Sequence, residues 1–181
     1  MSAEPCLRHY SFAAVARTDA RTLVLGSMPG AASLAAAQYY AHPQNQFWPI
    51  MEAICGAGRA LPYVLRLARL AEGHIALWDV LQSCVRPGSL DSAIEASSAE
   101  PNDIPALLRS HPGIARICCN GGTAHRELLR HFGSVLQRDF ARVAIVKLPS
   151  TSPAHAGMRL AQKLSAWVHA VQPASSRRAA R

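Results

Sequence analysis

The sequence has no apolar run of the roughly 18–20 residues that a membrane-spanning helix needs, although half of its 181 residues are hydrophobic. Its first residues, "MSAEPCLRHYSF", lack the basic-then-apolar order of a secretory signal. Disordered chains have low hydrophobicity, and this sequence does not. We therefore expect a cytoplasmic protein that does not span a membrane, in which one domain buries a sizeable core.

Cysteine pairs of the CxxC type are also missing. The five cysteines are an odd number, and they lie at Cys6, Cys55, Cys84, Cys118 and Cys119. Their spacing suits neither a disulfide framework nor a zinc or iron–sulfur site. The sequence therefore predicts reduced, mostly buried thiols, with no metal site and no cofactor.

Acidic residues are scarce: 11 Asp and Glu face 19 Lys and Arg, which gives a net charge of +8. The last residues, "SSRRAAR", include Arg177, Arg178 and Arg181; without them 16 basic residues still face 11 acidic ones, or +5. A basic surface favours a polyanionic partner such as nucleic acid, although many basic proteins bind none. We expect a domain over residues 1–172 and a basic, disordered tail over 173–181.

Four short, near-continuous apolar segments predict strands buried on both faces of a sheet. They are Leu23–Leu25, His74–Val80, Ala115–Cys119 and Ala141–Leu148. Apolar residues at helical spacing predict helices between and after them, at Tyr63–Glu72, Thr123–Phe132 and Arg159–Val171. The stretch Glu95–Asn102 is expected to be a loop. Alternating strands and helices indicate parallel βαβ units and a three-layer α/β/α domain.

Polar residues follow each of the four predicted strands. The segments are "GSMPG", "DVLQSCVRPGSLD", "NGGTAH" and "PSTSPAHAG", in that order. Ligands of open α/β sheets bind beyond the carboxyl ends of the strands, so these loops predict a single site. Taken separately, the first loop is equally a tight turn, and the third is equally a helix start capped by Thr123.

Stricter motifs are absent from these loops. "NGGTAH" lacks the Lys-Ser/Thr ending of a phosphate loop, and "GSMPG" lacks the GxGxxG dinucleotide spacing. A GxSxG nucleophile elbow is missing too, which leaves a hydrolase triad with little support.

The order of "GSMPG", "AHPQNQFW" and a late "STSPAHA" resembles the uracil-DNA glycosylase superfamily, and within it the hypoxanthine-DNA (deoxyinosine) glycosylase branch. The likeness runs from about Leu23 to Val171 and includes "WDVLQSCVRPGSLDSAI" and "CNGGTAH". It implies a four-stranded parallel sheet and action on DNA that contains deaminated bases. Such enzymes flip the base into a pocket and cut its N-glycosidic bond without a metal. We expect a monomer, although the sequence itself does not indicate the oligomeric state.

The resemblance places the catalytic asparagine at Asn45, whose amide can hold a water or bond the base. The alternative for Asn45 is a cap on the helix that contains Phe47. Related branches carry Asn or Asp where this chain has Met28, and His where it has Ser150, a weaker donor to the leaving base. Two alternatives therefore stay open: a nucleic-acid-binding protein that has lost catalysis, and an enzyme that excises uracil.

Tyr40 resembles the aromatic residue that stacks on the base. Core packing is its alternative role, and it is the favoured one for neighbouring Tyr39 and for Trp48. The remaining residues predicted to bind the base are Ser27, Met28, Phe47, Asp79 and Asn120. Asp79 contacts the base edge in this interpretation, and its alternative is a hydrogen-bonded structural carboxylate.

Three residues are predicted to contact the DNA backbone: Arg86, Ser152 and His155. Arg86 either binds a phosphate or pairs with Asp91. His155 lies where relatives insert a wedge or touch a phosphate, and its alternative is an ordinary surface histidine. The hydroxyls of residues 150–152 are expected to hold a phosphate together with the N-terminus of the last helix.

Lysine is missing from the predicted site loops, because Lys147 lies in the last strand and Lys163 in the last helix. An amine that forms a Schiff base with the sugar therefore has no candidate. This predicts a monofunctional glycosylase.

Overall fold

The computed structural model describes residues 7–171, and its centre is a four-stranded parallel sheet. The strands run in the order β3-β2-β6-β7. Their bounds are β2 (Thr22–Gly26), β3 (Ile75–Asp79), β6 (Arg116–Asn120) and β7 (Ala144–Leu148). Each overlaps one of the four predicted segments, so the predicted sheet is confirmed.

The central strand β2 shows why these segments are apolar at successive positions. All five of its residues are buried. Leu23 and Leu25 pack into one hydrophobic cluster, whereas Val24 between them packs into another. Successive side chains of a strand point to opposite faces, so the sheet must be covered on both sides.

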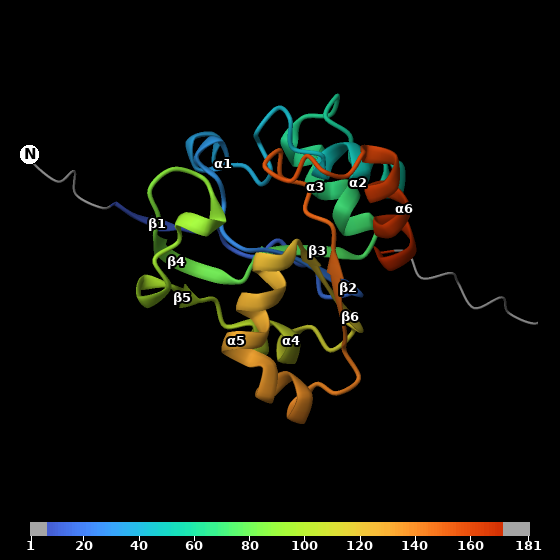
Figure 1. The fold of residues 1–181 in the computed structure, drawn as a ribbon. Coiled ribbons are helices and arrows are strands. Elements are labelled where there is room, and N and C mark those ends of the chain that lie inside the picture. Colours follow the sequence, from blue (N-terminus) through green and yellow to red (C-terminus); the bar gives the residue numbers. More distant parts are fainter. Residues whose placement is uncertain (1–6, 172–181) are drawn as a thin grey trace, which may run out of the picture.

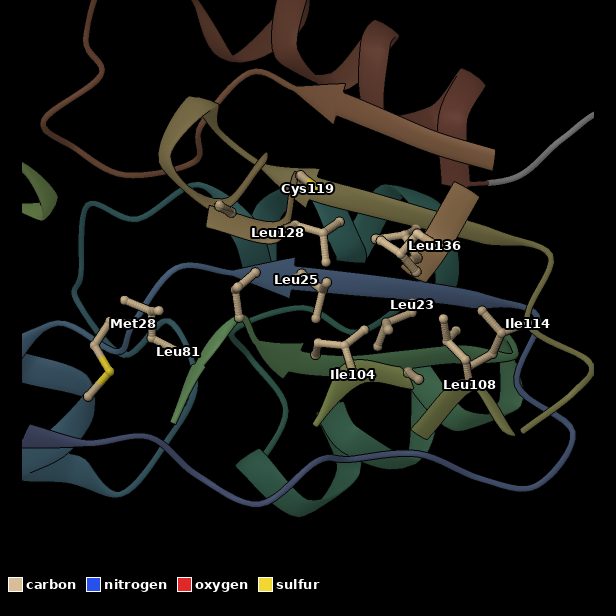
Figure 2. Close-up of a cluster of buried hydrophobic side chains, with 14 of the residues drawn as sticks. Leu23, Leu25, Met28, Leu81, Ile104, Leu108, Ile114, Cys119, Leu128 and Leu136 are labelled. Carbon is tan, nitrogen blue, oxygen red and sulfur yellow. The ribbon is translucent and has the colours of Figure 1, made fainter. Parts of the chain in front are cut away.

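Helices cover each face of the sheet, as Figure 1 shows. On one face lie α4 (Ile104–Ser110) and α5 (Gly122–Asp139). Figure 2 shows Ile104 and the leucines of these helices against Leu23 and Leu25. On the other face lie α2 (Phe47–Cys55), α3 (Tyr63–Glu72) and α6 (Leu160–Val171). The predicted three-layer α/β/α sandwich is therefore confirmed.

A second, smaller sheet was not predicted. It is antiparallel, in the order β1-β4-β5, and consists of β1 (Arg8–Tyr10), β4 (Leu81–Val85) and β5 (Glu100–Pro101). The short helices α1 (Ala31–Ala36), η1 (Asp91–Ala93) and η2 (Ala96–Ser98) complete the elements of residues 7–171. Because η2 and β5 lie within residues 95–102, the prediction of a plain loop there is wrong. Segments of two or three residues carry no readable periodicity.

The predicted helices differ from the observed ones in detail. α3 has the predicted bounds, but α5 continues to Asp139. Its N-cap is Gly121, so Thr123 lies inside the helix and the predicted Thr123 cap is wrong. In α6, Lys163 is buried while Leu160 is 39% exposed, which reverses the expected faces at these two positions.

The cysteines within the described residues are free: Cys84, Cys118 and Cys119 are buried and Cys55 is half-buried. Burial raises the pKa of the Cys118 and Cys119 thiols to about 12. Within residues 7–171, no helix is both long and apolar enough to cross a membrane. Cys6 and the predicted tail over 173–181 lie outside the described residues.

Candidate active site

A cavity of about 570 Å³ opens at the carboxyl edge of the parallel sheet. Cavities that bind small ligands in proteins span roughly 300–1,000 Å³. Residues that follow all four strands line it, among them Gly26–Ser33, Asp79, Ser89–Ser92, Asn120–Thr123 and Ser150–His155. The structure thus brings the four predicted loops together at one site.

Asn45 lines this cavity and also supports the start of α2. Its Oδ1 accepts the N–H of Phe47, the first residue of that helix, at 2.9 Å. Arg59 donates to the carbonyl oxygen of Asn45 at 2.8 Å. Both roles considered for Asn45 are therefore compatible: the helix contact orients an amide that faces the cavity.

Tyr40 lines the cavity, and its ring stacks on Phe47 with a centroid distance of 4.0 Å and an interplanar angle of 28°. Phe47 itself is fully buried. The prediction that Phe47 binds the base directly is therefore wrong, because Tyr40 stands between it and the cavity. The φ of Tyr40 is +53°, a strained value for a bulky residue and one that tends to mark functional sites.

Buried neighbours fix the backbone that precedes Tyr40. The indole N–H of Trp48 donates to the carbonyl of Tyr39 at 3.0 Å, and the N–H of Tyr39 donates to the Tyr63 hydroxyl at 3.0 Å. Tyr39 is 3% exposed and Trp48 is fully buried. Core packing is thus the role the structure gives these two aromatic residues, as expected.

Asp79 and Gly26, the last residues of β3 and β2, form the floor of the cavity. The Asp79 side chain is buried, and no group of the described residues bonds its Oδ2. Burial raises the pKa of Asp79 to about 8; Asp91 adds to the shift and Arg86 opposes it. Gly26 has to lack a side chain, since a Cβ there would collide with Oδ1 of Asp79.

Ser27 and Arg86 join the first loop to the segment after β4. The Ser27 hydroxyl donates to Oδ2 of Asp91 at 2.6 Å, and Nη1 of Arg86 lies 3.6 Å from Oδ1 of the same carboxylate. Arg86 also donates to the carbonyl of Pro29. Its side chain is fully buried, so the prediction that Arg86 contacts DNA is wrong, and pairing with Asp91 is the alternative that holds.

Met28 and Asn120 line the cavity but are also tied to the structure around it. Met28 is 6% exposed and packs into the core near Leu81, as Figure 2 shows. Asn120 exchanges two hydrogen bonds of 2.9 Å with Thr151, one through its amide oxygen and one through its amide nitrogen. Asn120 therefore holds the third and fourth loops together.

Ser150, Ser152 and His155 line the cavity from the fourth loop. Oγ of Ser150 accepts the N–H of Ser152 at 3.2 Å, which leaves its own hydroxyl hydrogen free to donate. α6 begins only at Leu160, and Thr151 is fully buried. The expected phosphate site formed by residues 150–152 and the N-terminus of the last helix is therefore wrong.

Neither of the two lysines considered above, Lys147 and Lys163, lines the cavity. Lys163 is buried, and its Nζ donates to the carbonyl of His155 at 2.9 Å, which fixes the fourth loop. Lys147 points outward from β7. Within the described residues, no lysine lines the cavity.

Several cavity residues were not identified from the sequence. Arg126, in the first turns of α5, has a side chain that is 64% exposed. His42 lies beside Asn45, and the Ser89 hydroxyl accepts the N–H of Ala31 at 2.9 Å. Two sequence features could have indicated them. Arg126 follows "NGG" within the first turns of a helix, and Ser89 lies in the turn-forming "RPGS" before Leu90.

Comparisons with known proteins agree with this architecture. A match to the Uracil DNA glycosylase superfamily spans residues 13–171. A protein named Hypoxanthine DNA glycosylase from Methanosarcina acetivorans is 36% identical over 125 residues, which are 67% of this chain and 78% of the relative. Its namesake from Methanosarcina barkeri is 32% identical over 130 residues, or 70% and 81% of the two chains.

A solved structure gives the same picture. The solution NMR structure of a Methanosarcina acetivorans protein that bears the name of a uracil DNA glycosylase superposes with a TM-score of 0.72. That protein is 29% identical and is matched over its full length, against 92% of this chain.

The fold and the cavity at its carboxyl edge therefore define a DNA glycosylase, a hydrolase that acts on N-glycosyl bonds. The chain belongs to the uracil DNA glycosylase superfamily, and its relatives described above include enzymes named for hypoxanthine.

Proposed function

We propose that this glycosylase removes hypoxanthine from DNA in which adenine has been deaminated. The observation that carries the proposal is the amide of Asn45, oriented by Phe47 at the wall of a cavity large enough for a purine. The names of the two relatives support hypoxanthine as the base.

In the proposed reaction the nucleotide flips out of the duplex and the base enters the cavity beside Tyr40. The bond between C1′ of the sugar and N9 of the base breaks, and its electron pair leaves with the base. The sugar takes on oxocarbenium character until the oxygen of a water bonds to C1′ and releases a proton.

Asn45 positions the attacking water in this proposal. An amide oxygen has two lone pairs, and the Phe47 N–H occupies one of them, so the second can accept from the water. Ser150 donates its free hydroxyl hydrogen to the departing base. Ser27 and Asn120 bond residues of the neighbouring loops, so they contribute to base binding by holding these loops in position.

We further propose that the enzyme is monofunctional, because no lysine of the described residues lines the cavity. The free cysteines of the described residues suit a reducing compartment, in line with the expected cytoplasmic location. His155 and Ser152, at the mouth of the cavity, are proposed to contact the DNA strand.

The test is to incubate the protein with oligonucleotides that contain inosine, uracil or xanthine, and then to cleave abasic sites with alkali. We expect cleavage at inosine that depends on the alkali treatment. Faster excision of uracil than of hypoxanthine would show that uracil is the preferred substrate. Binding without excision of any of the three bases would favour a protein that has lost catalysis.

A further inference from the structure

The floor of the cavity holds a carboxyl group that the reaction above does not use. Asp79 is 2% exposed and lines the cavity, yet no described residue bonds its Oδ2. A buried carboxylate oxygen without a hydrogen-bond partner is costly, and such atoms in native proteins call for an explanation.

Gly26 shows that the fold makes room for this carboxyl group. A Cβ at Gly26 would collide with Oδ1 of Asp79 and would lie 3.1 Å from the Tyr40 hydroxyl. The Tyr40 hydroxyl is also buried without a partner of ordinary geometry in the described chain. The Asp79 carboxyl group and the Tyr40 hydroxyl thus both lie beside Gly26 at the bottom of the cavity.

The surroundings of Asp79 determine its protonation. Asp91 and Arg86 are the charged groups that act on it, and they oppose each other. The other titratable groups nearby are the tyrosines Tyr39, Tyr40 and Tyr63, and burial raises the pKa of all three hydroxyls. These rings are therefore neutral at physiological pH, and burial is the largest influence on Asp79.

Deamination replaces an amino group, which donates hydrogen bonds, by a carbonyl oxygen, which accepts them. An ionised carboxylate would repel that oxygen, whereas a neutral carboxylic acid can donate to it. The donated bond would also strengthen as negative charge develops on the departing base.

We propose that Asp79 acts as a neutral acid that donates a hydrogen bond to the carbonyl oxygen which deamination creates, and so selects the damaged base. This inference rests on the proposed function. It assigns the choice of base to Asp79 and predicts that loss of the Asp79 carboxyl proton inactivates the site.

The first experiment measures single-turnover excision of hypoxanthine between pH 5.5 and 9.5. The wild-type rate should fall at high pH with a midpoint near 8, the pKa of Asp79, and by about tenfold per pH unit beyond it. In Asp79→Asn this fall should disappear, because an amide N–H donates at every pH in the range. Asp139→Asn, a change at an exposed aspartate, should leave the profile unchanged.

A second variant tests the electrostatic cause. Asp91→Asn removes the negative neighbour that raises the Asp79 pKa, so the fall in rate should move to lower pH. A purely structural role for Asp79 would leave the position of that fall unchanged. An alkaline fall that stays at the same pH in Asp79→Asn would overturn the proposal.

Base analogues locate the hydrogen bond. With an oligonucleotide containing unsubstituted purine, which lacks the 6-oxo group, Asp79→Ala should change the rate little. With hypoxanthine the same variant should lose roughly tenfold to a hundredfold. Equal losses on both bases would contradict recognition of the carbonyl oxygen.

The last measurement does not depend on activity. Carboxyl carbon NMR of the free protein should show Asp79 titrating near pH 8. Titration near pH 4 would overturn the proposal even if the enzyme excises hypoxanthine. Absence of hypoxanthine excision together with titration near pH 8 would instead reject the proposed substrate and retain the neutral acid.

Discussion

Asn45 has two structural features that the sequence analysis treated as alternatives: it bonds the start of α2 and it lines the cavity. A residue before a helix is expected either to cap it or to face a ligand, and here Oδ1 bonds the Phe47 N–H while the side chain lines the cavity. The helix contact removes the rotational freedom of the amide. Preorganisation of this kind favours transition-state stabilisation, because orientation is already set before the water arrives.

Replacement of Asn45 by Ala should therefore lower the single-turnover excision rate far more than it weakens DNA binding. It should also cost about 1 kcal/mol of unfolding free energy through the lost helix contact. Asn45→Asp keeps an oxygen for the Phe47 N–H and should recover that stability, as measured by urea unfolding. An Asn45→Ala enzyme with a near wild-type rate would place the catalytic role elsewhere.

Tyr40 presents a ring and a hydroxyl whose contributions can be separated. The ring rests on Phe47, whereas the hydroxyl is buried without a partner of ordinary geometry in the described chain. Tyr40→Phe should thus be mild for excision and neutral or stabilising for the fold. Tyr40→Ala should lose roughly 1–3 kcal/mol of base stabilisation, seen as weaker binding of inosine DNA. Equal damage from both changes would assign the role to the hydroxyl.

At the scale of elements, the four parallel strands were predictable because each contains an apolar run, which is buried throughout in β2 and interrupted by exposed Lys147 in β7. All five residues of β2 are buried, so this strand has no solvent-facing polar positions. The small sheet β1-β4-β5 was not predictable, since β5 has two residues and β4 mixes buried Ser83 with exposed Gln82. Its pairing depends on tertiary contacts, such as the Ser83 hydroxyl donating to Glu100 at 2.7 Å.

Some features of the site could likewise be predicted from the sequence pattern, whereas others depend on tertiary packing. The loops converge because parallel strands end at one edge of the sheet, which the sequence predicts. Which side chains then face the cavity depends on depth: Phe47 lies beneath Tyr40, and Arg86 lies beneath the first loop. The type of a residue does not indicate how deeply it is buried. The predicted base contact of Phe47 and the predicted DNA contact of Arg86 were wrong for this reason.

The junction between the third and fourth loops depends on one glycine. Gly121 has a φ of +99°, and a Cβ there would lie 2.9 Å from the Cβ of Ser150. Gly121→Ala should therefore push the two loops apart, cost about 1–3 kcal/mol of unfolding free energy, and reduce excision. Gly122→Ala is the matched control: it meets nothing within 4 Å and should be neutral or slightly stabilising in thermal unfolding. Similar losses in both variants would argue against the Ser150 contact.

At the scale of the whole molecule, positive charge is expected to draw the enzyme to DNA. The chain carries +8, of which three charges belong to the arginines of the predicted tail, outside the described residues. Arg126 lines the cavity and its side chain is 64% exposed, whereas Arg86 is buried and does not line the cavity. We therefore predict that Arg126, rather than Arg86, contacts the DNA backbone.

DNA affinity should fall linearly with salt on a log–log plot, because each phosphate contact releases counterions. Arg126→Ala should reduce that slope by about one, as expected for a single lost contact. Arg138→Ala removes another exposed arginine of the same helix, one that does not line the cavity, and should leave the slope unchanged. Deletion of residues 173–181 should flatten the slope only if the tail contacts DNA, with little change in single-turnover excision. A deletion variant that binds normally but no longer excises would instead place the tail in the active site.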